Sequence, residues 1–240
     1  MPPMHNFLPT TLPLMRIEPE DVAVEAQAWE ERCAALKKPL IAMLIGGETN
    51  PFIMNRQVAH DLVATARWVV DELGGTPYVT TSRRTTPEVI EVLQQDLPPE
   101  AVFYQWSADA EENPYRALLG SADGFIVTAD SVSMMVEVAR LGKPLAIFPL
   151  PKQQKLKERL SAFFLRVLRG ETGASPRPRP SKLVAGAVGY SRDFDALYQV
   201  LLDRGLGVKL GVEFPKSGAR PADELAEVVA RVREVLAKPR

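Results

Sequence analysis

The stretch PLIAMLIGGETN, residues 39–50, joins an apolar run to a glycine-containing turn and decides the fold class. Leu40 to Ile45 is short and apolar on both faces, which is typical of a strand buried in a parallel sheet. Gly46 and Gly47 end the run, and a region of helical periodicity follows them. The stretch therefore predicts a strand, a turn and a helix, which is the repeating unit of an α/β fold.

Further apolar runs continue this pattern along the chain. The other expected strands are residues 78–81, 101–104, 125–128 and 145–148. Helices are expected over residues 55–73, 132–141, 153–169, 192–202 and 222–236, and one more begins at a capping box formed by Thr85 and Glu88. The alternation predicts an α/β fold with a doubly wound, Rossmann-like parallel sheet and closing C-terminal helices.

The placement of proline sets the expected domain organisation. Proline accounts for 21 of the 240 residues, and five prolines crowd residues 1–20, which predicts an extended lead-in. Three more alternate with arginine between Pro176 and Pro180, which predicts a stiff linker. We expect a lead-in at 1–20, a Rossmann-like domain at 21–170, a linker at 171–182 and closing helices at 183–240.

Composition argues against several classes of protein. Lys and Arg number 29 against 30 Asp and Glu, so the net charge of -1 gives no basic footprint for nucleic acid. An apolar run of about 18 residues is missing, and so is the pattern of a signal peptide. Cys33 is the single cysteine, and His5 and His60 lack the spacing of metal ligands. We expect no intrachain disulfide, no metal site and a reducing, cytoplasmic setting.

The basic stretch, residues 152–182, departs from this charge balance. It holds nine basic and two acidic residues and has a net charge of +7. Such charge on an amphipathic helix can mark contact with an anionic membrane surface. The favoured interpretation is that the apolar stripe packs inside the protein while Lys and Arg face water.

Small and polar residues follow three of the expected strands. The carboxyl ends of parallel strands meet at one edge of a sheet, where ligands bind. Glycine lets the backbone approach an anion, helix N-termini bind phosphate, and Arg supplies charge and several donors. The pattern predicts a site for an anionic, phosphorylated small molecule. Its residues are Gly46, Gly47, Ser82, Arg83, Arg84, Thr85, Ser131 and Ser133.

Each group also has a structural interpretation that stays open. The glycines can serve a tight turn, the arginine pair can be solvated, and Ser131 or Ser133 can cap a helix. Glu137, about one turn beyond Ser133, can accept hydrogen bonds from ribose hydroxyls or face solvent. Asp130 is more typical of a helix cap than of a general base.

In the same order along the chain, several motifs resemble the mitochondrial-fission Elm family. Bacterial members of that family are often labelled predicted nucleoside-diphosphate-sugar epimerases. Its organisation is similar to the C-terminal, donor-binding domain of GT-B glycosyltransferases. The motifs are LIGG at 44–47, TSRRT at 81–85, NPY at 113–115, SAD and VTADSVSM within 121–134, Glu137, and GKP at 142–144.

This resemblance implies that the anion is a nucleoside-diphosphate sugar and that no metal or other cofactor is obligatory. It implies that glycine and serine residues bind the pyrophosphate and that a glutamate binds the ribose. It also implies that a tryptophan stacks on the base, although this tryptophan could equally belong to the core or an interface. It assigns no catalytic residue. Residue by residue, Gly46, Gly47, Ser131 and Ser133 match the pyrophosphate loops, Arg83 and Arg84 the family's SRR element, Glu137 the ribose acid, and Trp106 the base-stacking position.

The sequence also departs from the GT-B pattern. The chain begins where the N-terminal acceptor domain would be ending, so it is either a fragment or a short member, and the implied partner is a separate acceptor domain or a homo-oligomer neighbour. The epimerase label is disfavoured, because no tyrosine has a lysine four residues later and the dinucleotide fingerprint is missing. We expect a glycosyltransferase-like domain that binds a nucleotide sugar. The alternative is a non-catalytic interaction module.

Overall fold

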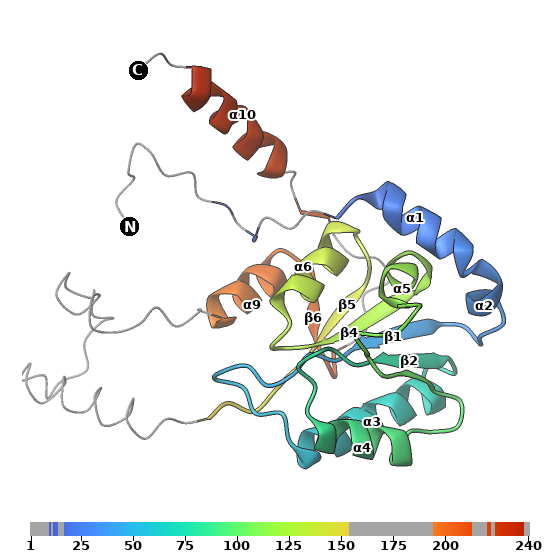
Figure 1. Cartoon of the computed structure of the whole chain (residues 1–240). Coiled ribbons are helices and arrows are strands. Elements are labelled where there is room, and N and C mark those ends of the chain that lie inside the picture. The colour runs from blue at the N-terminus through green and yellow to red at the C-terminus, as the bar shows by residue number, and fades with distance from the viewer. Residues whose placement is uncertain are drawn as a thin grey trace, which may run out of the picture.

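A computed structural model describes residues 10, 12–13, 17–153, 194–212, 220–221 and 224–237. Its centre is a parallel sheet with the strand order β3-β2-β1-β4-β5-β6 (Figure 1). The predicted doubly wound parallel sheet is therefore confirmed. The strands are β1 (Leu40–Leu44), β2 (Thr76–Thr80), β3 (Val102–Tyr104), β4 (Gly124–Thr128), β5 (Leu145–Phe148) and β6 (Val208–Lys209).

Helices cover both faces of this sheet (Figure 1). On one face lie α3 (Arg56–Asp71) and α4 (Pro87–Asp96), which connect the strands on one side of β1. On the other face lie α5 (Tyr115–Ser121), α6 (Val132–Arg140) and α9 (Phe194–Asp203). Because β-α-β connections are right-handed, the two directions of winding place their helices on opposite faces. Outside this layer, α1 (Pro19–Ala28) packs on α5 and is followed by α2 (Glu30–Ala34), whereas α10 (Glu224–Ala237) projects from the body.

Apolar burial explains why the expected strands form. All residues of β1, β2, β4 and β5 are buried, as expected for central strands covered on both faces. The helix predicted from Asn55 is also confirmed, because the Asn55 side chain accepts a hydrogen bond from the backbone N–H of Val58 at 3.1 Å. Gly74 follows that helix with a φ of 65°, a conformation that glycine adopts without strain.

The predicted capping box at Thr85 and Glu88 is wrong. Thr86 occupies the N-cap position of α4, and no side chain caps that helix. The Thr85 hydroxyl instead donates to the carbonyl oxygen of Gly46 at 2.5 Å and accepts from the N–H of Ser82 at 2.9 Å. The Thr85 hydroxyl therefore bonds within its own loop and to the loop after β1, and it does not cap α4 as the sequence pattern predicted.

Several elements differ from the sequence prediction. Helix α1 was not predicted, and it begins at Pro19, inside the expected lead-in, because proline is tolerated in the first turn of a helix. Helices α2 and α5 and strand β6 were not predicted, since each is seven residues or shorter. The expected helix 153–169, the linker 171–182 and the basic stretch beyond Gln153 lie outside the described residues. Among the helices that are described, none is long and apolar enough to cross a membrane.

The strand order fixes where a ligand site can form. Strands β1 and β4 are neighbours, but the chain leaves β1 toward β2 and leaves β4 toward β5. The two connections depart in opposite directions, and in doubly wound sheets ligands bind beyond the carboxyl ends of the strands at such a point. The loops that carry Gly46 and Asp130 begin at this switch point.

Candidate functional site

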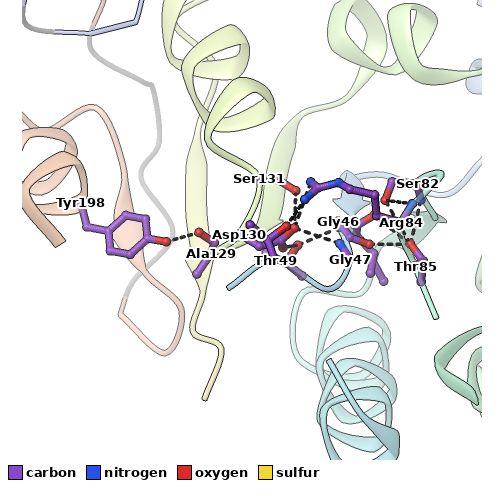
Figure 2. A network of polar contacts seen from close by, with 12 residues as sticks. Gly46, Gly47, Thr49, Ser82, Arg84, Thr85, Ala129, Asp130, Ser131 and Tyr198 are labelled. Carbon is purple, nitrogen blue, oxygen red and sulfur yellow. Dashed lines mark hydrogen bonds and ion pairs between the residues drawn. The ribbon is translucent and has the colours of Figure 1, made fainter. Parts of the chain in front are cut away.

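Three loops meet at the carboxyl edge of the sheet (Figure 2). They follow β1, β2 and β4 and are joined by hydrogen bonds across the switch point. The Gly46 N–H donates to the Thr128 hydroxyl at 2.8 Å, and the Gly47 N–H donates to the Asp130 carboxylate at 2.9 Å. The N–H of Glu48 donates to the carbonyl oxygen of Arg84 at 3.2 Å. We call this assembly the three-loop network.

The two glycines of the first loop are required by the other two loops. A Cβ on Gly46 would lie 2.1 Å from both Asp130 Oδ2 and Ser131 Oγ. A Cβ on Gly47 would lie 1.9 Å from the carbonyl oxygen of Arg84. The glycines are therefore required by the close approach of the loops, and neither has the positive φ of a glycine-dependent turn. A contact of either glycine with phosphate stays a prediction.

Asp130 is the centre of the three-loop network. Its side chain is fully buried, and its carboxylate accepts from the hydroxyls of Thr128 at 2.7 Å and Ser131 at 3.2 Å as well as from Gly47. Burial raises the pKa of Asp130, while these hydrogen bonds and the charge of Arg84 oppose that rise. Asp130 therefore connects loops and does not cap α6. The sequence indicated no such role, because its partner Gly47 lies far away along the chain.

The arginine pair divides into one engaged and one free side chain. Arg84 donates from Nη1 to the Thr49 hydroxyl, and its Nη2 lies 3.3 Å from Asp130 Oδ2. The Arg84 side chain is still 43% exposed, so solvent reaches the guanidinium. Within the described ranges, the exposed Arg83 makes no hydrogen bond or ion pair. Arg84 thus belongs to the network, and Arg83 keeps all its donors for other partners.

Ser82 shapes the second loop from within. Its N–H donates to the Thr85 hydroxyl, its own hydroxyl lies 3.2 Å from the Thr85 hydroxyl, and it accepts from the N–H of Arg84 at 3.3 Å. These contacts fold residues 82–85 into a compact turn. The structure thus brings Ser82 and Thr85 to the predicted edge, where their polar atoms contact protein atoms.

The two serines of the third loop also differ. Ser131 occupies the N-cap position of α6, but its hydroxyl donates to Asp130 instead of accepting a first-turn N–H. Ser133 is exposed in the first turn and makes no hydrogen bond within the described residues. The first-turn N–H groups of a helix have no intrahelical acceptor. The Ser133 hydroxyl and these N–H groups are therefore donors that a ligand could use.

Glu137 lies apart from the three-loop network. Its carboxylate accepts a hydrogen bond from the Tyr115 hydroxyl at 2.5 Å. Burial, followed by the charge of Glu137, raises the pKa of Tyr115 well above its ordinary value. Both side chains face a cavity of about 470 Å³ between α1, α5 and α6, which we call the α1–α5–α6 cavity. Its lining residues are Ile17, Glu18, Asp21, Val22, Tyr115, Arg116, Leu119 and Glu137.

Trp106 is partly exposed in the loop after β3. Its backbone N–H donates to the Thr81 hydroxyl at 2.8 Å, which ties this loop to the end of β2. The side chain is not among the hydrophobic residues that pack against the core. The stacking of Trp106 on a base stays a prediction.

An aromatic cluster that sequence reasoning missed supports the network from the side of α9. Phe52 packs edge-on against Phe194 with ring centroids 5.0 Å apart, and Tyr198 donates to the carbonyl oxygen of Ala129 (Figure 2). Burial is the largest cause of the raised pKa of Tyr198. The only sequence signal was the apolar stripe of α9, which does not reveal its partners. The cluster fixes the first and third loops against the C-terminal part of the chain.

Acidic side chains near the start of α9 are candidate metal ligands by their type, and one of them is engaged with a lysine. Asp195, in the first turn of α9, is the second acid of an Asp193-Phe194-Asp195 sequence, and it forms an ion pair with Lys152. Its companion Asp193 lies outside the described residues. No group of three His, Cys, Asp or Glu side chains within the described ranges is arranged to hold a metal ion.

Comparisons with known proteins place the chain in context. Residues 2–171 match the family described as Mitochondrial fission ELM1. The chain is 32% identical over 146 residues to "Mitochondrial fission protein ELM1" of Arabidopsis thaliana, covering 61% of this chain and 34% of that protein. It is also 32% identical over 124 residues to "Uncharacterized protein RP120" of Rickettsia prowazekii (strain Madrid E), covering 51% and 35%. The matches span about a third of the length of each relative.

Proposed function

The chain belongs to the Mitochondrial fission ELM1 family, and from this premise we propose that its switch-point edge binds a nucleoside-diphosphate sugar. One observation carries the proposal. The loops after β1, β2 and β4 converge at the switch point and present an exposed guanidinium there. Doubly wound sheets bind ligands at this position, and Arg is suited to phosphate because its planar fork donates two parallel hydrogen bonds.

The three-loop network divides the predicted site residues into two groups. Gly46, Gly47, Ser82, Thr85 and Ser131 are held by protein partners and build the edge. Direct contact with the diphosphate is assigned to the side chains that keep free donors. In this proposal those are Arg83, the exposed part of Arg84, Ser133 and the first-turn N–H groups of α6.

Glu137 receives the ribose in this proposal. Its position on α6, one turn beyond Ser133, puts both side chains on the same face of the helix. The Tyr115 hydroxyl orients the carboxylate, and the α1–α5–α6 cavity gives room beside it. Trp106 remains the proposed base-stacking residue. A ligand along α6 would place its phosphates toward Ser133 and its ribose toward Glu137.

A transfer reaction would use the same donors. Charge on the departing diphosphate would be stabilised by the helix N-terminus near Ser133 and by Arg83 or Arg84, with no obligatory metal. A general base is not assigned, and an acceptor domain or a second copy of the chain would complete the reaction. A cytoplasmic location and the absence of a nucleic-acid partner also remain predictions.

Calorimetric titration with UDP, GDP and ADP tests the proposal. We expect one of these nucleotides to bind, and Arg83→Ala to weaken it by roughly 1.5–3 kcal/mol, or about 10- to 150-fold. Arg83 is the sharper choice than Arg84, since its removal leaves the network contacts intact. Arg56→Ala is a matched control, because Arg56 is an exposed arginine on α3 that pairs with Glu91. Binding of none of the three nucleotides would refute the proposal.

A second candidate function is that of a non-catalytic interaction module. Val229, Val232 and Leu236 lie on one side of α10 and are 39%, 51% and 79% exposed, and no residue of that helix is buried. An exposed apolar stripe of this kind is typical of a surface that contacts another protein. The relative from Arabidopsis thaliana is named for mitochondrial fission. Donor-hydrolysis assays distinguish the two functions, because only the glycosyltransferase-like chain would release nucleoside diphosphate from a donor sugar.

A further inference from the structure

The Asp130 carboxylate has the surroundings of a bound anion. It accepts from a backbone N–H of a glycine-containing loop, from two hydroxyls and from a guanidinium, and its side chain is fully buried (Figure 2). Backbone N–H groups, hydroxyls and Arg are also the donors that proteins use to hold phosphate. The chain therefore already places one negative charge at the point where three donor-bearing loops converge.

The loop geometry is built around this carboxylate. A Cβ on Gly46 would collide with Asp130 Oδ2, so the first loop closes directly onto the acid. Asp130 accepts from both sides of the switch point, because Gly47 follows β1, Thr128 ends β4 and Ser131 follows Asp130. An external anion cannot reach these donors while the carboxylate holds them.

Arg84 is the member of this donor set that a ligand can capture. It is the single cation that pairs with Asp130 in the described part of the chain. The Arg84 side chain is 43% exposed, whereas the Asp130 side chain has no exposed surface. At 3.3 Å, the Arg84 contact is also the longest of the four hydrogen bonds to the carboxylate. A phosphate arriving from solvent therefore meets the guanidinium first and competes with Asp130 for it.

We propose that Asp130 is an internal competitor that sets the affinity of this edge for phosphate groups. A diphosphate binds when Arg84 exchanges the Asp130 carboxylate for a phosphate oxygen, while Gly47, Thr128 and Ser131 keep the carboxylate in place. The identity of the ligand rests on the proposed function. The competition itself requires only an anion that bears phosphate. Removing the charge of Asp130 frees Arg84 and removes a nearby negative charge, so phosphate binds more tightly.

The experiment measures the affinity of the full chain for inorganic pyrophosphate and for UDP, GDP and ADP by calorimetry. Asp130→Asn keeps the size of the side chain and an acceptor for the Gly47 N–H. We expect it to bind pyrophosphate about 3- to 10-fold more tightly than the unmodified chain. In an Arg84→Ala background the same substitution should give no gain. Asp109→Asn is the matched control, because Asp109 is exposed in the loop after β3 and its replacement changes the net charge equally.

The outcomes separate this inference from the proposed function. Tighter pyrophosphate binding in Asp130→Asn with no nucleotide binding would support the competitor and refute the nucleotide-sugar proposal. Equal or weaker pyrophosphate binding in a folded Asp130→Asn chain would overturn the competitor, even if nucleotides bind. If neither pyrophosphate nor a nucleotide binds any chain, both ideas fail. Asp130→Ser, which also removes the charge, replaces Asp130→Asn if thermal melting shows that the latter is unfolded.

Discussion

The three-loop network and the α1–α5–α6 cavity use polar side chains in opposite ways. In the network, a buried carboxylate is surrounded by four donors, and the glycine beside it leaves no room for a methyl group. In the cavity, Glu137 and Tyr115 bond to each other beside about 470 Å³ of open space. The first arrangement holds loops together, whereas the second leaves volume for a ligand. Substitutions in the network should therefore lower the free energy of unfolding, and substitutions in the cavity should lower it by a smaller amount.

Gly46→Ala should give the largest effect. The new methyl group would overlap Asp130 and Ser131, so we expect the free energy of unfolding to fall by about 3 kcal/mol in denaturant titrations. Gly205→Ala is the control, because nothing lies within 4 Å of its Cβ and only its φ of 63° opposes the change. That strain should cost roughly 1 kcal/mol. An equal fall in the free energy of unfolding in the two variants would show that the loops around Gly46 are less tightly packed than these contacts indicate.

Asp130→Ala should give the next largest effect. It removes the acceptor of Gly47, Thr128 and Ser131 together, and buried donors without acceptors are costly. We expect a loss of about 2 kcal/mol, measured in the same denaturant titration. A loss smaller than that of the cavity variant Tyr115→Phe would reverse the proposed ranking of the two regions.

Tyr115→Phe tests the cavity. It deletes the hydroxyl that donates to Glu137 and keeps the aromatic ring, so we expect a loss of about 1 kcal/mol. Tyr104→Phe is the matched control, because its hydroxyl donates at 2.9 Å to the Glu112 carbonyl oxygen at an exposed position. There water can replace the lost bond, and the loss should be roughly 0.5 kcal/mol. If Tyr115→Phe lowers the free energy of unfolding more than Asp130→Ala does, the cavity contributes more to stability than the network.

The fold could be predicted from the sequence because most of its strands are short apolar runs that alternate with helical segments. Strand β5 coincides with its predicted run. Strands β1 to β4 each differ from their own predicted runs by two residues or fewer at each end. Helix α5, with the sequence YRALLGS, is too short to give a period and has no side-chain cap. Strand β6 has two residues, so pairing with β5 and not local sequence defines it.

The candidate site was predicted less completely, for a physical reason. The carboxyl ends of parallel strands meet at one edge, so the sequence predicted that the loops after β1, β2 and β4 lie together. The structure places Gly46, Arg84 and Ser131 of these loops at one edge. Which side chains bond to each other depends on contacts between residues far apart in sequence. Asp130 appeared to be a cap because the loop that fills its acceptor positions is distant. Glu137 was assigned to the ribose from its spacing to Ser133, and its hydrogen bond with Tyr115 could not be predicted because Tyr115 lies on another helix.

The pH dependence of stability should give the smallest effect. Burial raises the pKa of Asp130 in the folded chain above its usual value of 3.8, so the folded state holds this proton more tightly than the unfolded state. The contribution of Asp130 to stability is therefore full below that value and declines as the pH rises through the folded pKa. Arg84 is the charged group that faces Asp130 within the described residues.

Unfolding titrations between pH 4 and pH 7 measure this contribution when the unmodified chain is compared with Asp130→Asn. The stability of the unmodified chain relative to the variant should decrease with rising pH. An increase would mean that the hydrogen bonds and the charge of Arg84 lower the pKa of Asp130 more than burial raises it. The network would then stabilise the negative charge of Asp130.

The pairing of β5 with β6 has a consequence for the synthesis of the protein. Phe148 ends β5, and Val208 begins the strand that covers its outer edge. At ribosomal elongation rates of about 5–20 residues per second, the interval between the two is several seconds. During that time the backbone groups of Ala146 and Ile147 lack the partners that Val208 and Lys209 later supply, and an open edge is a template for pairing with another chain. The edge of β5 is therefore exposed to such pairing until β6 emerges, and a chaperone that shields this edge would act during that interval.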